Sequence, residues 1–161
     1  MDKKLQSIFN EQIKNELYSE YLYLSMAAYF ETVNLLGFSH WMKKQAGEEK
    51  VHAMKIFDFL CDRGVRVILE AIPQPPTEFS SVKEVFEETL KHEKKVTALI
   101  NNLYNLSQKV NDQAAMVFLH WFIAEQVEEE KNPAKILEDI KMIKPDSGAI
   151  LILDRELAKR E

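Results

Sequence analysis

The sequence predicts an all-α protein: an antiparallel four-helix bundle with one long crossover and a short fifth helix at its C-terminal end. Four long segments carry apolar residues at helical spacing and are almost free of helix breakers, because the chain has only 4 Gly and 5 Pro. The breakers separate these segments by a short, a long and a short connection, an order typical of bundles with a single crossover. The predicted helices cover about 5–32, 38–63, 81–109, 112–143 and 147–159, within one domain of residues 1–161.

Turn residues mark the ends of the first two helices. Asn34 and Gly37 indicate a short turn after the first helix, and Gly64 is suited to cap the second. The next segment, 65–79, holds three of the prolines. Its beginning, Val65 to Leu69, has the composition of a strand, but the chain offers no partner strand. We therefore expect an extended crossover connection.

The third and fourth helices have their own end signals. Ser80 or Ser81 is placed to cap the third helix, with Glu84 positioned to close a capping box on Ser81. Asn111-Asp112 forms a tight turn and a cap for the fourth helix. Within that helix, Asn132-Pro133 predicts a kink or a stop and restart, because the proline has no N–H for the carbonyl of Glu129.

The last segment, Ser147 to Lys159, follows Lys144-Pro145-Asp146 and is predicted to form the short fifth helix. Ile150, Leu151, Leu153 and Leu157 make it too apolar for a solvated tail. We expect it to dock on another part of the protein.

Composition excludes several classes of protein. No apolar run approaches the length that spans a bilayer, and the N-terminus carries no signal-peptide core. The net charge of −5 gives no reason to expect nucleic-acid binding. The single cysteine, Cys61, excludes an internal disulfide, fits a reducing compartment, and is expected to lie buried as a small apolar residue. We therefore expect a cytoplasmic protein without a membrane or nucleic-acid partner.

Each long helix places one glutamate in its apolar stripe. Glu49 has Met42 and Ile56 seven residues to either side, and two helical turns return a side chain to nearly the same direction. His52, three residues after Glu49, projects from the same face. The corresponding residues of the other three helices are Glu16, Glu93 and Glu129.

Four carboxylates in one core need compensation. Each uncompensated buried carboxylate costs several kcal/mol, and a domain has only about 5–15 kcal/mol of net stability. Protonated pairs in a structural carboxylate cluster are one solution, and two divalent cations are the other. We favour a dinuclear metal site, with His52 as a nitrogen ligand. Carboxylates with one imidazole and no thiolate suit Fe(II) or Mn(II), although Zn(II) also fits such ligands.

Several motifs are similar to those of a known family. They are Asn15-Glu16-Leu17-Tyr18 with Tyr23-Leu24, His40-Trp41-Met42 to His52, His92-Glu93, and Phe118-Leu119-His120-Trp121-Phe122 to Glu125-Gln126-Val127-Glu128-Glu129-Glu130. In this combination the chain resembles the non-haem ferritins of the prokaryotic type, over nearly its whole length.

The resemblance implies a ferritin-like domain that stores iron and acts as a ferroxidase. Two Fe(II) ions would bind in each subunit. Glu16, Glu49 and His52 would form the first iron site, with Glu49 bridging to a second site completed by Glu93 and Glu129. O2 or peroxide would oxidise the iron, and Fe(III) would collect as a mineral inside a hollow shell of 24 subunits. The fifth helix would pack near a four-fold axis of that shell.

The resemblance also implies roles for neighbouring residues. Gln126 would form hydrogen bonds or hold water near the iron pair, and Tyr23 would donate a hydrogen bond or an electron, with simple core packing as the alternative for Tyr23. A possible third iron site would use Glu48, Glu125, Glu128 and Glu129. Haem is not expected, because Lys50 stands where bacterioferritins carry the methionine that binds haem.

Two other classes remain as alternatives. A diiron peroxidase or oxygenase of the rubrerythrin-like class would need an electron-transfer module, and a lone Cys61 cannot form a rubredoxin site. A DNA-protecting mini-ferritin would place its ligands at a subunit interface and would lack the terminal helix, unlike this chain.

Overall fold

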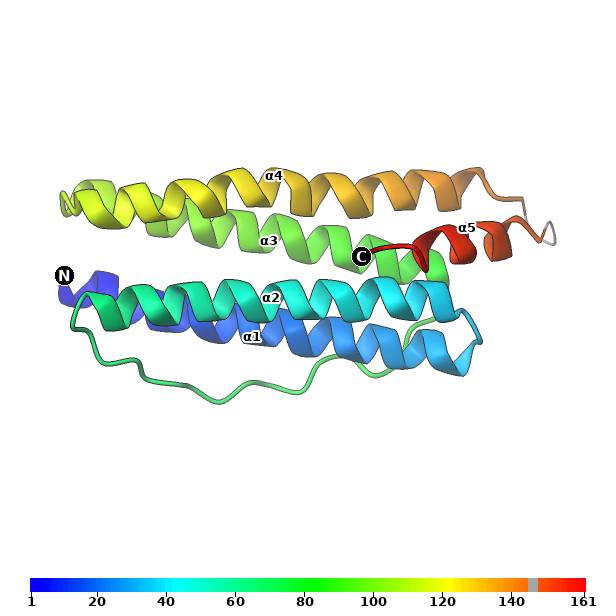
Figure 1. Ribbon diagram of the computed structural model, residues 1–161, viewed down its shortest axis with the longest axis horizontal. Helices are drawn as coiled ribbons and strands as arrows, with labels where there is room; N and C mark the ends of the chain where they lie inside the picture. The colour runs from blue at the N-terminus through cyan, green and yellow to red at the C-terminus, as the bar shows by residue number, and fades with distance from the viewer. Residues whose placement is uncertain (145–147) are drawn as a thin grey trace.

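The computed structural model describes residues 1–144 and 148–161, which form five helices (Figure 1). They are α1 (Lys3–Thr32), α2 (Leu36–Asp62), α3 (Val82–Lys109), α4 (Gln113–Met142) and α5 (Ala149–Leu157). α1 packs along α2 and α3 packs along α4, and the long crossover runs back along the outside of the first pair (Figure 1). No strand occurs in the described ranges, so the predicted all-α bundle with one crossover and a short fifth helix is confirmed.

The ends of the first two helices follow from local chemistry. The Asp2 carboxylate caps α1 by accepting hydrogen bonds from the backbone N–H groups of Lys4 at 2.9 Å and Leu5 at 3.1 Å. Asn34 lies in the turn between α1 and α2 with φ of 59°, a left-handed conformation that asparagine tolerates well. Gly64 takes φ of 67° directly after α2, where a side chain would be strained.

The caps of α3 and α4 also follow the sequence. Ser81 Oγ accepts a hydrogen bond from the N–H of Glu84 at 3.1 Å, and Asp112 accepts one from the N–H of Ala115 at 3.1 Å. The reciprocal bond of the capping box differs from the expected one, because the Glu84 carboxylate accepts from the N–H and hydroxyl of Ser80 and not from Ser81. The helix therefore begins as predicted, with its acidic side chain reaching one residue further back.

The crossover is an extended connection fastened to α1. The Asn10 side chain accepts a hydrogen bond from the Ile68 N–H at 2.7 Å, and Lys14 pairs with Glu70 at 2.6 Å. These contacts replace the sheet hydrogen bonds that an apolar extended segment would otherwise need.

Two expectations from the sequence are wrong. The expected stop and restart of α4 at Asn132-Pro133 is wrong, because the helix continues through a buried Pro133 to Met142; a kink at this position stays a prediction. The missing hydrogen bond costs about 3 kcal/mol, and burial of Ile136 and Leu137 in the next turn offsets this loss. Cys61 is exposed, because it lies about 100° around α2 from the buried Leu60.

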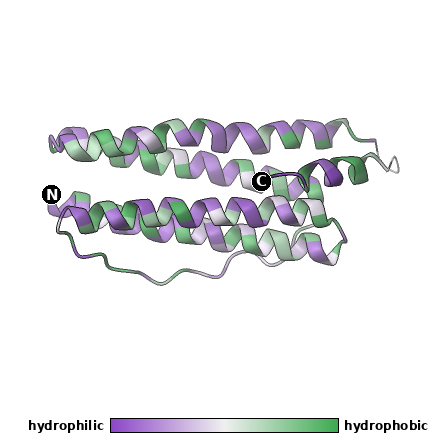
Figure 2. Cartoon of the chain, in the orientation of Figure 1, coloured by the Kyte–Doolittle hydropathy of each residue, from purple (hydrophilic) through white to green (hydrophobic). Residues whose placement is uncertain are grey.

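The core consists of two apolar clusters with a polar layer between them. The α5-end cluster contains Phe30, Phe38 and Phe86, and the N-end cluster contains Phe9 and Leu60 among others. Along each long helix the residues of one cluster give way to those of the other near mid-helix, and the polar layer fills that position. Figure 2 shows this amphipathic mixture of hydrophobic and hydrophilic residues along all four long helices.

α5 folds back against α2 (Figure 1). Its residues Ile150, Leu153 and Leu157 pack against the α5-end cluster, which confirms that the segment docks, whereas Leu151 and Ile152 remain exposed. The expected start of this helix at residue 147 lies outside the described residues.

None of the helices in the described ranges is both long enough and apolar enough to cross a membrane.

Candidate metal centre

The four glutamates predicted from the apolar stripes lie in the polar layer. Glu16, Glu49 and Glu93 are each 1% exposed, and Glu129 is 5% exposed. Each comes from a different long helix, so the centre lies within a single chain. The apolar clusters above and below hold the helices at the spacing that brings these side chains together.

The carboxylates and His52 form two groups of three that share Glu49. In one group, ligand atoms of Glu16, Glu49 and His52 lie within 4.8 Å of one another; in the other, those of Glu49, Glu93 and Glu129 do. Nδ1 of His52 is 3.6 Å from Oε2 of Glu49. A carboxylate that belongs to both groups can bridge two metal ions, so the arrangement suits a pair of ions.

One carboxylate oxygen lacks any partner. Oε1 of Glu16 accepts a hydrogen bond from Gln12 at 2.8 Å, but Oε2 is buried and has no hydrogen-bond partner among the residues the structure describes. An unsatisfied buried carboxylate oxygen costs free energy that a directly bound cation would recover. The oxygen and imidazole groups of the site are ligands that suit Fe(II), so Oε2 of Glu16 is positioned to bind such an ion.

Burial changes the acidity of the whole group. Burial raises the pKa of Glu16 to about 8, with a further contribution from the nearby Glu49 carboxylate. Burial likewise raises the pKa values of Glu93 and Glu129 to about 7, and that of Glu49 well above its ordinary value. Without a metal ion the centre therefore holds protons at neutral pH, and binding a cation must release them.

Two glutamines that the sequence analysis missed orient these carboxylates. Gln45 is 2% exposed and donates to Oε1 of Glu49 at 3.2 Å and also to Glu129. Gln12 and Gln45 each precede a site glutamate by four residues, so both helices carry the pattern Gln-x-x-x-Glu. That spacing places amide and carboxylate on one helix face and was a usable signal.

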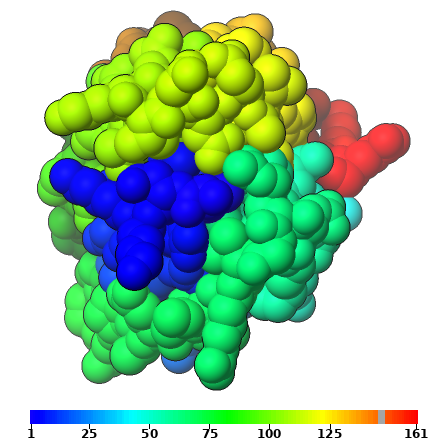
Figure 3. Space-filling model, turned by 90° about the vertical axis from the view of Figure 1, so that its left-hand side faces the viewer, coloured from blue at the N-terminus to red at the C-terminus, as the bar shows by residue number. Residues whose placement is uncertain are grey.

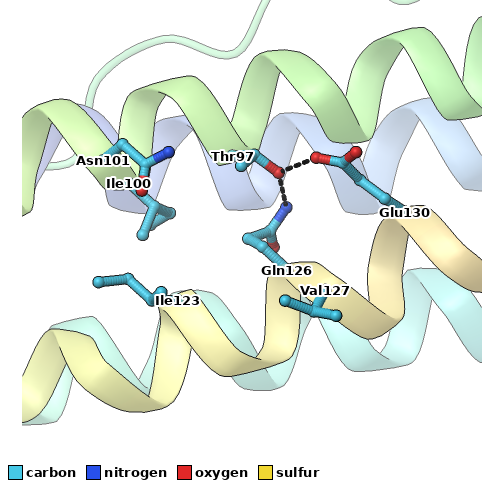
Figure 4. A pocket seen from close by; sticks show the side chains of 7 residues that line it. All are labelled: Thr97, Ile100, Asn101, Ile123, Gln126, Val127 and Glu130. Carbon is cyan, nitrogen blue, oxygen red and sulfur yellow. Dashed lines mark hydrogen bonds between the residues drawn. The ribbon is translucent and has the colours of Figure 1, made fainter.

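Gln126 lies beside Glu93, as expected, and leads to a groove between α3 and α4. Its amide donates to Oε2 of Glu93 at 3.4 Å and to Thr97 Oγ1 at 3.2 Å, and Thr97 donates to Glu130 at 2.6 Å. Figure 4 shows the two hydrogen bonds of Thr97, with Gln126 and with Glu130, beside this groove, which has a volume of about 380 Å³. Gln126 therefore separates the groove from the buried carboxylates.

Tyr23 is fully buried and its hydroxyl donates a hydrogen bond to Glu93. Burial raises the pKa of Tyr23 well above its ordinary value, and the Glu93 carboxylate adds to this effect. The phenol therefore keeps its proton and acts as a hydrogen-bond donor to the centre.

The residues expected for a third site are only partly brought together. Ligand atoms of Glu125, Glu129 and His52 lie within 4.8 Å of one another. In the part of the chain that the structure describes, Glu48 and Glu128 belong to no such group. Glu128 is exposed, and Glu48 forms an ion pair with Arg160.

Comparison with known proteins places this architecture in a family. The sequence profile of the ferritin-like domain matches residues 6–143. The chain belongs to the ferritin family. Its resemblance to prokaryotic non-haem ferritins is confirmed by the relatives that it matches.

Relatives of this ferritin occur in bacteria and archaea. The bacterial non-heme ferritins of Staphylococcus saprophyticus and Bacteroides fragilis are each 39% identical to it over 160 residues. The match covers 99% of this chain and 96% and 99% of theirs, respectively. A crystal structure of an open pore ferritin from Archaeoglobus fulgidus superposes with a TM-score of 0.98 and 45% identity, covering 100% of this chain and 98% of that one.

Proposed function

We propose that this ferritin stores iron by oxidising Fe(II) at the intrasubunit centre and collecting Fe(III) as a mineral inside a hollow shell of 24 subunits. Iron is both the substrate and the cargo. O2 or peroxide takes the electrons from two Fe(II) ions, and each Fe(III) then moves toward the interior of the shell.

The observation that carries this proposal is the shared position of Glu49. Its carboxylate lies within 4.8 Å of ligand atoms in two separate groups of three, which suits two ions held side by side. A pair of Fe(II) ions supplies two electrons together, as reduction of peroxide to water requires.

The remaining residues have supporting roles. Glu16 and His52 complete the first iron site, and Glu93 and Glu129 complete the second, bridged by Glu49. Gln126 and Tyr23 donate hydrogen bonds to Glu93 and hold its carboxylate in place. A third iron ion is proposed near Glu125 and Glu129, with Glu48 and Glu128 able to join only after their side chains turn.

Assembly into a shell is supported by exposed apolar residues on one side of the subunit. Tyr21 and Leu24 of α1 are 52% and 42% exposed, and Ile68 and Leu69 of the crossover are 61% and 65% exposed. Leu24 and Ile72 line a common hollow there. An apolar surface of this kind is covered when subunits associate. The archaeal structure named above is that of an open pore ferritin, which shows that ferritin shells differ in their pores. Imaging of the assembled particle therefore tests the proposed shell.

The decisive experiment removes two ligands from α2. We expect Glu49→Ala with His52→Ala to reduce aerobic Fe(II) oxidation to the rate in protein-free buffer, because the proposed bridging carboxylate and the imidazole ligand are both lost. Oxidation is followed by ferric absorbance, and soluble ferric iron is tested for co-elution with a shell-sized particle.

The matched control is Asp58→Ala, which removes an exposed carboxylate from the same helix. This variant should oxidise and store iron as the parent does. If the double variant forms an intact shell and still oxidises Fe(II) as fast as the parent, the proposed ferroxidase centre is wrong.

A further inference from the structure

The C-terminal end of the chain reaches back to α2 beside the metal centre. The Arg160 guanidinium lies 4.5 Å from the centroid of the Trp41 ring and donates to the Trp41 carbonyl at 3.3 Å. It also donates to Oε1 of Gln45 at 3.0 Å and to the carboxylate of Glu48. The Arg160 side chain is only 19% exposed. One cation at the end of the chain thus contacts three residues on successive turns of α2.

The surrounding contacts hold this end of the chain firmly in place. Asp154 of α5 accepts a hydrogen bond from the N–H of Phe38 at 2.9 Å, which caps α2 where its own N-cap residue, Leu35, provides no side-chain bond. Nε2 of His40 lies 2.7 Å from the Arg160 carbonyl. A Cβ atom at Gly37 would lie 1.7 Å from the Asp154 carbonyl oxygen, so glycine is required for this docking. In Figure 3 the C-terminal segment projects at the edge of the bundle next to α2.

Arg160 determines which way the Gln45 amide points. An arginine side chain has only donors, so Gln45 must present its oxygen to Arg160. Its NH2 group then points to Glu49 and Glu129, to which it donates. Without Arg160 the amide could rotate and place its oxygen against the two carboxylates, where it would repel them.

Arg160 also engages Glu48, which the sequence analysis assigned to a third metal site. Glu48 lies close enough to Glu129 for the two carboxylates to repel each other, yet it belongs to no metal-ligand group in the described structure. The guanidinium supplies the positive charge that a metal ion would otherwise supply to Glu48. A metal ion and Arg160 therefore compete for the same carboxylate.

We propose that Arg160 is a positioning residue for the metal centre: it orients Gln45 toward Glu49 and Glu129, and it acts as a built-in cation that holds Glu48 until a third metal ion displaces it. The inference rests on the proposed function, because it requires metal ions at the central carboxylates. By linkage, the third ion weakens docking of the C-terminal segment as much as docking weakens binding of that ion.

Zn2+ titration tests the inference with a redox-inert ion. Binding is measured by calorimetry on the assembled, metal-free parent, on Arg160→Gln and on the matched control Lys159→Gln. Lys159 is the neighbouring cation, lies just after α5 and forms an ion pair with Glu156 of that helix. In Arg160→Gln, the half-exposed Glu48 carboxylate loses its ion-pair partner and becomes free to bind metal, which should tighten binding of the third ion by roughly three- to tenfold. The first two ions should bind more weakly, because Gln45 is no longer oriented. Lys159→Gln should match the parent.

Two further measurements separate positioning from simple stability. Arg160→Lys keeps the charge but lacks the planar fork that contacts Gln45 and Glu48 together, so it should restore the parent's third-ion affinity and not the affinity for the first two. In the parent, hydrogen exchange of residues 154–161 should increase when the third ion binds and stay unchanged while the first two bind.

The outcomes separate a failure of the Arg160 inference from a failure of the proposed metal centre. If Arg160→Gln and Lys159→Gln give the same titration, or if the third ion leaves exchange of the C-terminal segment unchanged, Arg160 is not a positioning residue. If the parent itself binds no Zn2+ at the central carboxylates, the proposed metal centre fails, whatever the variants do.

Discussion

The polar layer and the two apolar clusters of this bundle are stabilised in different ways. In the clusters, rings such as Phe30, Phe38 and Phe86 pack against one another, and folding alone satisfies them. In the polar layer, folding brings together four carboxylates whose pKa values are all raised, and one buried oxygen keeps no partner. The packing of the two clusters thus holds the carboxylates of the polar layer in an arrangement that is favourable only when cations are bound.

The largest effect that we expect from this difference is the pH dependence of the metal-free protein. Glu16, Glu93 and Glu129 have folded pKa values of about 8, 7 and 7, raised from 4.5, so the folded state retains protons that the unfolded state releases. Their contribution to stability is complete below about pH 4.5 and is lost as the pH rises through 7 to 8. Each retained proton changes the free energy of unfolding by about 1.4 kcal/mol per pH unit.

Thermal unfolding at a series of pH values measures this effect. The melting temperature of the metal-free chain should fall from pH 5 to pH 8. Saturating Zn2+ should reverse the trend, because metal binding is favoured once the carboxyls lose their protons. A metal-free melting temperature that rises steadily over this range would show that the carboxylates are not held protonated in the core.

The next effect concerns the α5-end cluster. Phe86 is fully buried against Phe30, Phe38 and Trp41, so Phe86→Ala should lower the free energy of unfolding by about 3–5 kcal/mol. The loss should be the same with and without Zn2+, as measured by urea unfolding, because Phe86 packs against other aromatic rings and is not itself a metal ligand. A loss that doubles when Zn2+ is present would mean that cluster and polar layer are one cooperative unit.

The smallest effect concerns Tyr23, at the border of the two regions. Tyr23→Phe keeps the ring and removes only the donor to Glu93, so packing is preserved. We expect a loss of about 1–3 kcal/mol at neutral pH and weaker Zn2+ binding. Unchanged stability together with unchanged Zn2+ affinity would leave core packing as the role of this residue.

Much of the fold and of the proposed centre was predictable because the signals are local and periodic. Asp112 and Ser81 cap their helices by chemistry that acts over three residues. Glu16 and Glu49 stand out because a charge in an apolar stripe contradicts the pattern around it. Pro133 was misjudged because its local penalty was read without the packing of the turn that follows.

The contacts of Gln45 and Arg160 with distant residues could not be predicted from the sequence. Gln45 donates to Glu129, 84 residues away, and Arg160 contacts Gln45 across 115 residues. The spacing of Gln45 and Glu49 along one helix was a usable signal, but nothing in the sequence indicates the contacts of Gln45 with Glu129 or with Arg160, which depend on how the helices pack and where α5 docks. Only the packed helices bring these side chains within hydrogen-bond distance.

The sequence by itself determined the helices, the caps of α3 and α4, the crossover and the four buried glutamates with His52, because each depends on residue spacing along one helix or on a turn. The tertiary structure decided that Glu49 belongs to two ligand groups, that Glu48 pairs with Arg160 and that α4 continues through Pro133. These outcomes depend on how helices distant in the chain pack together, and packing energy acts between elements rather than along them.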